Sequence, residues 1–158
     1  MSEESLGPGR RAAIWLLHRY FALSRGMTLG VRAACFDAEG RVFLVRHSYV
    51  PGWYLPGGGV ERGETAAQAL TKELREEGNL ELTAPATLFH VYLNSHISRR
   101  DHVLFYRADV VQTAPRKPDR EIAESGFFDV AALPVDATPA TRRRLCELNG
   151  GFPPADGW

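Results

Sequence analysis

The amino-acid sequence predicts an α/β fold, and three kinds of segment indicate it. Strand-like apolar runs occur at residues 27–36 and 41–47. A run rich in alanine, leucine and glutamate predicts a central helix at about residues 65–77. A further helix-forming run predicts a final helix at about 138–148. Strands mixed with helices in this order are typical of an α/β domain.

The length and composition are those of one globular domain. The chain has 158 residues, 44% of them hydrophobic and 24% charged, so we expect a single domain over 1–158 with 1–25 as an N-terminal helical extension. The formal net charge is zero, which argues against a general attraction to DNA or to an acidic membrane. No apolar segment approaches the ~20 residues of a membrane-spanning helix. Two cysteines without a recognisable secretory leader predict a cytoplasmic protein with reduced thiols.

The first elements expected are a loose N-terminus over residues 1–9 and a helix over residues 10–23. The helix has a wide apolar surface that includes Ile14, Leu17 and Phe21, and arginines add positive charge to it. We expect this helix to pack on the domain. A dimerisation arm and a helix lying on a membrane surface are the alternatives.

Two strands at 27–36 and 41–47 are expected next, joined by a polar turn at 37–40. A short extended segment at 53–55 then leads to three consecutive glycines at 57–59. Three glycines alone predict no more than a flexible turn, so their meaning depends on the residues that come after them.

The central helix has well-defined ends in the sequence. Thr65 followed by Gln68 fits a capping box, which predicts that the helix begins just after Thr65. Gly78 and Asn79 are the two residue types that most readily adopt the left-handed conformation that ends helices. The helix is therefore predicted to end at about residue 77.

The second half of the chain predicts a long hairpin and two short elements. The hairpin strands are expected at 82–97 and 101–112, with a polar turn at 98–101. Two prolines within 113–120 predict a loop, and 126–128 predicts a short strand before the final helix.

Three glutamates of the central helix are placed against local stability. Glu73, Glu76 and Glu77 lie three and four residues apart and therefore share one helix face, where like charges repel by roughly 0.2–0.5 kcal/mol per pair. They also crowd the C-terminal half of the helix, where the macrodipole disfavours anions. A solvated face is the ordinary explanation of such a cluster. A hard divalent cation is the other, because Mg²⁺ and Mn²⁺ prefer carboxylate oxygens.

The segment from Gly58 to Leu80 resembles the Nudix box. The family pattern is Gly, five residues, Glu, seven residues, then Arg-Glu-aliphatic-any-Glu-Glu-any-Gly-aliphatic. The residues that match it are Gly58, Glu64, Glu73, Leu74, Glu76, Glu77 and Leu80. A match at fixed spacing over this length is far more specific than a lone glycine-rich motif.

Two residues depart from this pattern. Lys72 replaces the arginine, keeping its charge but losing its planar bidentate fork, which puts rate and metal geometry in question more than the fold. Asn79 replaces the second glycine, a mild change because asparagine tolerates the left-handed conformation and Gly78 is adjacent.

The resemblance implies a fold and a set of roles. The fold is an α/β/α sandwich around a mixed β-sheet. Glu76 and Glu77 match the principal metal ligands, and Glu73 matches a carboxylate that binds a second metal or accepts a proton from water. The carbonyl of Gly58 matches a further ligand, Glu64 a residue that orients the loop and helix, and Lys72 the residue that orients a catalytic carboxylate. Mg²⁺ or Mn²⁺ is the expected cofactor.

Three residues outside the box complete the predicted site. Glu121 lies in a segment that resembles the loop from which the family draws an extra ligand or base, although a solvated loop glutamate is the alternative. Arg46 and Tyr54 are candidate substrate-binding residues, for a phosphate and for a base or sugar respectively.

The resemblance implies a metal-dependent hydrolase that cleaves the pyrophosphate bond of a nucleoside diphosphate linked to another group. The alternative is a module that binds a nucleotide or metabolite with little or no turnover, which the Lys72 departure keeps open. RNA-end processing by the same chemistry is a third hypothesis, weakened by the lack of a long basic stripe. The expected partner is a small nucleoside diphosphate derivative, with no DNA and no membrane span. The sequence leaves the substrate and the preferred metal open, and a homodimer is possible.

Overall fold

The computed structural model describes residues 8–158. The loose N-terminus expected over residues 1–9 falls mostly on residues 1–7, which lie outside the described part of the chain. Residues 8 and 9 already belong to the first helix, α1 (Pro8–Ser24). This helix begins two residues earlier and ends one residue later than the sequence predicts.

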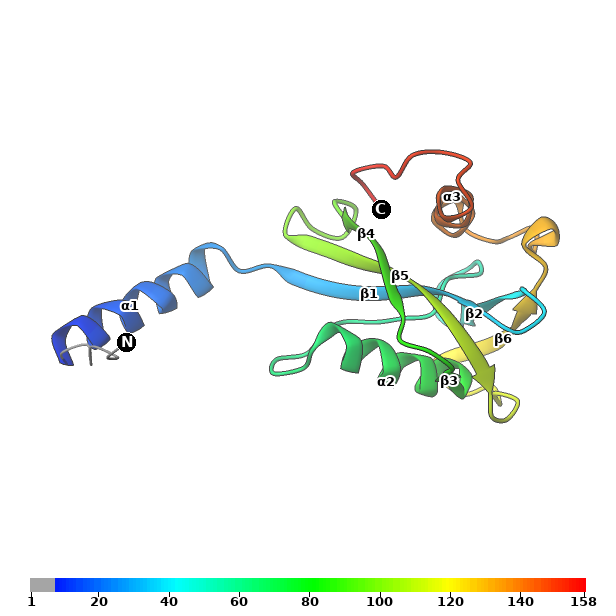
Figure 1. Ribbon diagram of the computed structural model, residues 1–158, viewed down its shortest axis with the longest axis horizontal. Coiled ribbons are helices and arrows are strands. Elements are labelled where there is room, and N and C mark those ends of the chain that lie inside the picture. Colours follow the sequence, from blue (N-terminus) through cyan, green and yellow to red (C-terminus); the bar gives the residue numbers. More distant parts are fainter. Residues whose placement is uncertain (1–7) are drawn as a thin grey trace.

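One mixed sheet forms the centre of the molecule (Figure 1). Its strands are β1 (Thr28–Phe36), β2 (Val42–His47), β3 (Leu80–Leu82), β4 (Thr87–Leu93), β5 (Asp101–Gln112) and β6 (Ile122–Phe128). The order is β3-β5-β1-β2-β6, and β4 also pairs with β5. The β1–β5 pair is parallel and the other strand pairs are antiparallel. Strands distant in sequence therefore meet at the centre of the sheet.

Helices cover both faces of this sheet, which confirms the predicted α/β/α sandwich. Figure 1 shows α2 (Ala66–Gly78) on one side and α3 (Pro139–Leu148) on the other. Because side chains alternate along a strand, Val31 and Ala33 of β1 lie on the face covered by α2, whereas Ala34 lies on the face covered by α3. The result is two buried apolar clusters, one on each face.

Three elements differ from the sequence prediction. The strand expected at 82–97 is split into β3 and β4, and Pro85, which lacks a backbone N–H, lies in the break. The strand expected at 126–128 begins at Ile122, because residues 122–126 also pair with β2. A 3₁₀ turn, η1 (Val130–Ala132), follows β6 and was not predicted.

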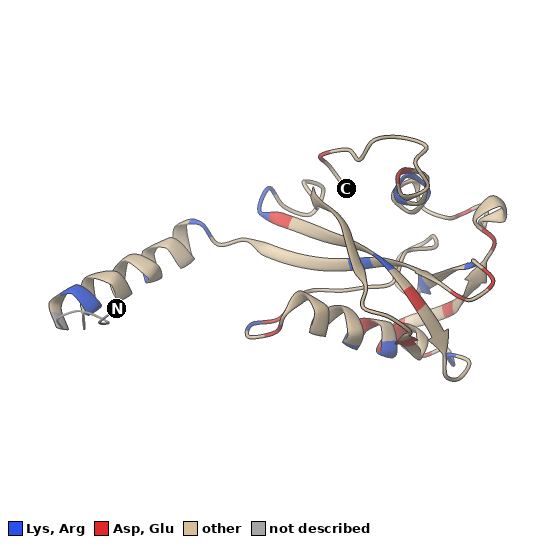
Figure 2. Cartoon of the chain, in the orientation of Figure 1, with Lys and Arg blue, Asp and Glu red and all other residues tan. Residues whose placement is uncertain are grey.

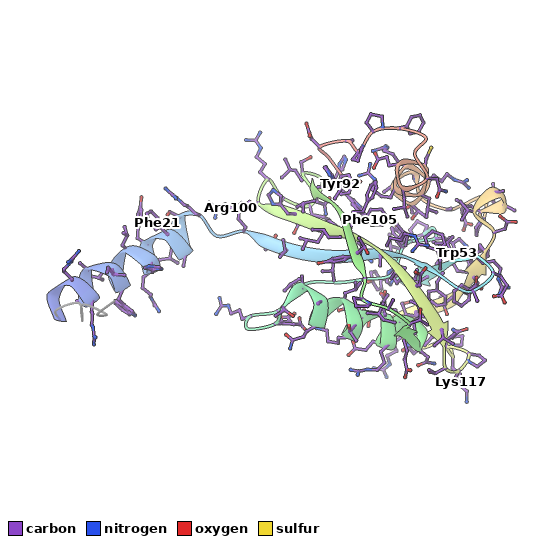
Figure 3. The ribbon with its side chains drawn as sticks, in the orientation of Figure 1. Phe21, Trp53, Tyr92, Arg100, Phe105 and Lys117 are labelled. Atoms are coloured by element: carbon purple, nitrogen blue, oxygen red, sulfur yellow. The ribbon has the colours of Figure 1, made fainter. Side chains whose placement is uncertain are left out.

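The expectation that the first helix packs on the domain is wrong. Figure 1 shows α1 projecting from the body, with residues 25–27 connecting it to β1. Large apolar side chains on it remain exposed, among them Leu16 (61%), Tyr20 (63%) and Leu23 (80%). Phe21, labelled in Figure 3, contacts the Arg25 guanidinium of the same segment. None of the described helices is long and apolar enough to cross a bilayer.

Both cysteines are free thiols. Cys35 is completely buried on β1, and its burial raises the pKa of the thiol far above the ordinary value. Cys146 lies half-buried on α3. The two thiols therefore occupy different environments, and the buried one is held in its protonated form.

Candidate active site

The glycine segment is held against β1 by backbone hydrogen bonds. Val31 donates its N–H to the Gly58 carbonyl at 2.8 Å, and Ala33 donates to the Pro56 carbonyl at 3.1 Å. The N–H of Val60 in turn donates to the Leu29 carbonyl at 2.8 Å. The segment is therefore fixed in position rather than flexible.

Two of the three glycines are required by close contacts. A Cβ on Gly57 would lie 2.0 Å from the Val31 carbonyl oxygen, and the positive φ of 143° further excludes other residues. A Cβ on Gly58 would lie 2.5 Å from the carboxyl carbon of Glu73. Gly59 has open space around it. The motif thus brings the loop backbone directly against a glutamate of α2.

The ends of α2 match the sequence prediction closely. Thr65 and Gln68 form both hydrogen bonds of the capping box. Asn79 adopts the left-handed conformation itself (φ 52°, ψ 37°), so Gly78 does not take that role. Gly78 is needed instead because a Cβ there would lie 2.7 Å from the ring of Phe43.

Four glutamates line one cavity of about 340 Å³ beside α2. Glu73, Glu76 and Glu77 come from the helix, and Glu121 comes from the loop between β5 and β6. Figure 2 shows acidic positions gathered at the half of α2 that approaches β6. The residues singled out from two separate parts of the sequence therefore face the same space.

The loop that carries Glu121 is tied to the helix by Arg116 and Asp119. The Arg116 guanidinium donates to the Glu76 carbonyl at 2.8 Å and also to the Asp119 carboxylate. That carboxylate accepts the backbone N–H groups of Glu121 (2.9 Å) and Ile122 (2.8 Å). The arginine and these N–H donors hold the pKa of Asp119 well below its usual range. Arg116 and Asp119 line the cavity too, and the sequence prediction did not include them.

Glu77 is the most strongly perturbed carboxylate of the site. It is 5% exposed, and burial raises its pKa to about 7. The Arg32 charge and the Gly57 N–H, which donates to the Glu77 carboxylate at 2.7 Å, act in the opposite direction. Without a cation, this buried carboxyl group therefore holds a proton readily near neutral pH.

Lys72 lies closer to Glu64 than to Glu73. Its ammonium is 3.1 Å from one Glu64 oxygen and 4.0 Å from Glu73. Glu64 also accepts the N–H of Glu61 at 3.0 Å, and this hydrogen bond lowers the pKa of the Glu64 carboxyl. Burial raises the pKa of Glu73, while the nearby lysine acts against this. Lys72 and Glu64 therefore link α2 to the loop that precedes it.

His47 lies beside the site without forming an ion pair. Its Nε2 is 3.9 Å from Glu77, but burial and the Arg32 charge lower the pKa of the imidazole and favour its neutral form. Its buried Nδ1 has no hydrogen-bond partner among the described residues. His47 was not among the predicted site residues.

The donors at the small cavity fit a hard divalent cation. No group of three acidic, histidine or cysteine side chains among residues 8–158 already has the spacing of a metal site. The chemistry of the donors nevertheless agrees: several carboxylates face one space, two have raised pKa values, and Gly58 leaves room for Glu73 against the backbone. The Gly58 carbonyl already accepts one hydrogen bond, which leaves one lone pair for a ligand.

The two candidate substrate residues differ in their placement. Tyr54 lines a second cavity of about 810 Å³, and its hydroxyl donates to the Pro51 carbonyl at 2.9 Å. Arg46 lines neither cavity and lies 3.4 Å from Glu124 on the neighbouring strand. Arg32 lines the larger cavity but was not predicted. Its charge within an otherwise apolar strand is the signal that could have identified it.

Comparisons with known proteins agree with this geometry. A family profile described as "NUDIX domain" matches residues 26–148. The 8-oxo-dGDP phosphatase NUDT18 of Mus musculus is 31% identical over 100 residues, which cover 63% of this chain and 31% of that protein. The ADP-ribose pyrophosphatase of Methanocaldococcus jannaschii is 31% identical over 103 residues, which cover 62% of this chain and 60% of that protein. The chain thus spans less than two thirds of the length of these relatives.

A solved structure shares the fold over most of the chain. The MutT NUDIX hydrolase from Burkholderia pseudomallei has a TM-score of 0.63 and 29% sequence identity. The match covers 75% of this chain and 95% of the other.

Proposed function

Because this chain belongs to the Nudix family, we propose that it is a metal-dependent hydrolase that cleaves the pyrophosphate bond of a nucleoside diphosphate linked to another group. The observation that carries the proposal is the single cavity lined by Glu73, Glu76, Glu77 and Glu121. Relatives named 8-oxo-dGDP phosphatase and ADP-ribose pyrophosphatase support a substrate that contains a nucleoside diphosphate.

The glutamates have distinct parts in this proposal. Glu76 and Glu77 would hold Mg²⁺ or Mn²⁺, with Glu121 and the Gly58 carbonyl as further ligands. A cation held there would neutralise the phosphate oxygens, whose negative charge otherwise repels a nucleophile. Glu73 either joins these ligands or accepts a proton from the attacking water, and its raised pKa makes it a better base than an exposed carboxylate. Lys72 and Glu64 fix the position of the loop against α2.

A substrate panel with product masses tests this function. The purified protein is incubated with Mg²⁺ or Mn²⁺ and nucleoside triphosphates, nucleotide sugars, ADP-ribose, dinucleoside polyphosphates or capped RNA. We expect hydrolysis of at least one compound at its pyrophosphate bond, and a loss of more than about 100-fold in Glu77→Gln. Glu81→Gln, an exposed glutamate on β3, is the matched control and retains activity.

The binding module predicts a different outcome of the same panel. Saturable nucleotide binding without product, under both metals and with every compound, would favour the module over the enzyme. The carboxylates grouped at one cavity favour the enzyme, because a module that binds an anionic nucleotide gains little from four glutamates.

We also propose that α1 is a contact between two copies of the chain. Leu16, Tyr20 and Leu23 follow one another at spacings of four and three residues, so they form one apolar stripe, and each is more than half exposed. Arg11 lies on the opposite face, where it remains in water when the stripe is covered, and Arg25 follows the last residue of the helix. A second copy supplies a matching stripe, which is the self-complementary surface that a twofold dimer requires.

A further inference from the structure

The larger cavity lies next to the glutamates and has no assigned ligand. Its volume of about 810 Å³ is within the range of sites that enclose small molecules. Gly58 belongs to its lining and also packs against Glu73 of the smaller cavity. Arg32 lines the larger cavity, while its charge acts on Glu77 in the smaller one. The two spaces are therefore adjacent, with Gly58 and Arg32 at their boundary.

Trp158 forms part of the wall of this cavity, although most of the other lining residues lie far from it in the sequence. The chain after α3 returns to the sheet, where Trp158 donates its N–H to the Leu93 carbonyl at 3.0 Å. Leu93 donates in turn to the Asp156 carbonyl at 2.9 Å. Residues 156–158 thus continue the sheet beside β4 and carry the indole to the cavity.

A buried ion pair on α3 holds this returning segment. Arg144 (0% exposed) and Glu147 (4% exposed) lie 2.9 Å apart. Arg144 donates to the Gly157 carbonyl at 2.9 Å, and Glu147 accepts the Ala155 N–H at 3.3 Å. Desolvation makes a buried pair weak evidence of added stability, but both of its members form hydrogen bonds to the returning segment.

The indole of Trp158 is also supported by other aromatic rings. Tyr92 and Phe105 pack edge-on against it, with centroid separations of 5.5 and 5.9 Å. Figure 3 shows Tyr92 and Phe105 together between the sheet and α3. Tyr92 is fixed by a 2.7 Å hydrogen bond from its hydroxyl to Glu147. Trp158 is therefore held between these rings and the Arg144 guanidinium, which lies 5.4 Å from the ring centroid, and the half-buried indole also lines the cavity.

A polar cluster lines the same cavity. Asp101 accepts hydrogen bonds from the Thr28 hydroxyl (2.6 Å) and from the Asn94 amide (2.8 Å). These bonds orient the Asn94 side chain, and they leave its carbonyl oxygen, its second N–H and further carboxylate lone pairs for a ligand. Both donors and acceptors are thus available, as the edge of a heterocyclic base requires.

We propose that this cavity binds the nucleoside end of the substrate, with the base stacked on Trp158 and its polar edge facing the cluster of Thr28, Asn94 and Asp101. The assignment rests on the proposed function, because the diphosphate then extends past Arg32 toward the glutamates. Arg32 is suited to this position, since its guanidinium recognises phosphate and is already oriented by a 3.0 Å hydrogen bond to the Leu55 carbonyl.

Nucleotide binding without turnover tests the assignment first. Adenosine, guanosine, cytidine and uridine monophosphates are titrated without metal, and tryptophan fluorescence is recorded. We expect saturable quenching in the wild type for at least one of them. Trp158→Ala weakens that affinity about tenfold or more, since stacking on an aromatic side chain contributes on the order of 1–3 kcal/mol per base. Trp158→Phe retains part of the affinity, which isothermal calorimetry measures for both variants.

Trp15→Phe is the matched control, because Trp15 is exposed on α1 and lines neither cavity. Its affinity stays at the wild-type value. Inorganic pyrophosphate, which has no base, binds the wild type and Trp158→Ala equally in the presence of Mg²⁺. Equal nucleotide affinity in wild type and a folded Trp158→Ala would overturn the proposal.

Turnover separates this proposal from the proposed function. With a hydrolysed substrate, Trp158→Ala raises KM about tenfold and leaves kcat within about twofold, whereas Glu77→Gln lowers kcat. Hydrolysis with an unchanged KM in Trp158→Ala would refute the base site and leave the hydrolase standing. Quenching that depends on Trp158, without hydrolysis of any compound, would support the base site and refute the hydrolase.

Discussion

Because Gly58 and Glu73 are in close contact, a single methyl group added at position 58 is enough to displace the Glu73 carboxylate. A Cβ at position 58 would meet the far end of the Glu73 side chain, which can move away without disturbing the backbone. Gly58→Ala therefore displaces the carboxylate while the fold survives. We expect hydrolysis to fall at least tenfold, with the melting temperature lowered by only a few degrees.

Gly59→Ala is the control for this prediction. The neighbouring glycine has open space around its Cα, so a methyl there meets nothing. Activity assays and thermal unfolding of the two variants are compared. Equal activities would show that the Gly58–Glu73 contact has no part in catalysis.

The Lys72 side chain gives a second prediction. Its single ammonium is 3.1 Å from Glu64 but 4.0 Å from Glu73, so it pairs much more closely with Glu64. Arginine has a planar fork with several donors and can bond both. We expect Lys72→Arg to preserve kcat or raise it severalfold, and Lys72→Met to lower it. A large loss in Lys72→Arg, measured under saturating metal, would show that the lysine has a separate role.

Among the helices, α1 differs because it projects from the body and exposes its apolar stripe. If two copies pair through α1, glutamates introduced into the apolar stripe repel each other and prevent the pairing. The variant carrying both Leu16→Glu and Leu23→Glu is expected to be monomeric by light scattering, while the wild type is dimeric. Hydrolysis per chain is measured alongside, because the glutamate cavity lies outside this helix.

The opposite face of α1 supplies the control. Arg11→Gln removes a charge from the helix but leaves its apolar stripe intact, so the dimer persists. A monomeric wild type would contradict the proposal. Binding of that monomer to vesicles would then support the membrane-surface alternative for the helix.

Residues close together in the sequence were sufficient to predict α2 and the loop that precedes it. The capping pair Thr65 and Gln68 and the left-handed Asn79 depend on near neighbours in the chain, so their pattern was visible. Trp158 was not predicted, because its role depends on Leu93 and Arg144, which only the fold brings to it. Arg46 was favoured for its place near the glycine loop, but β-pairing sets it opposite Glu124 instead.

For the molecule as a whole, the buried Glu77 couples stability to pH. Its pKa is about 7 in the folded chain, compared with an ordinary value of 4.5. Between these values the folded state holds a proton that the unfolded state has lost, so this group lowers stability as pH rises from about 4.5 to 7. The full effect above pH 7 is on the order of 3 kcal/mol. A bound cation offsets it by stabilising the ionised form.

The comparison of wild type with Glu77→Gln isolates this contribution. Glutamine can still accept the Gly57 N–H but does not ionise, so the variant lacks this pH dependence. Without metal, we expect the wild type to lose stability relative to the variant between pH 5 and pH 8 in denaturant unfolding. Mn²⁺ should raise the wild-type melting temperature more at pH 8 than at pH 5. Parallel stability curves for the two proteins would refute the assignment.

The parallel pairing of β1 with β5 has a consequence for how the chain folds during synthesis. Thr28 pairs with Asp101, so the first strand leaves the ribosome long before its partner has been made. Until then one edge of β1 is open to wrong partners, including other nascent chains. Contacts so distant in sequence also slow folding. The sheet therefore closes late in translation, and this interval is when a chaperone would most increase the yield of folded protein.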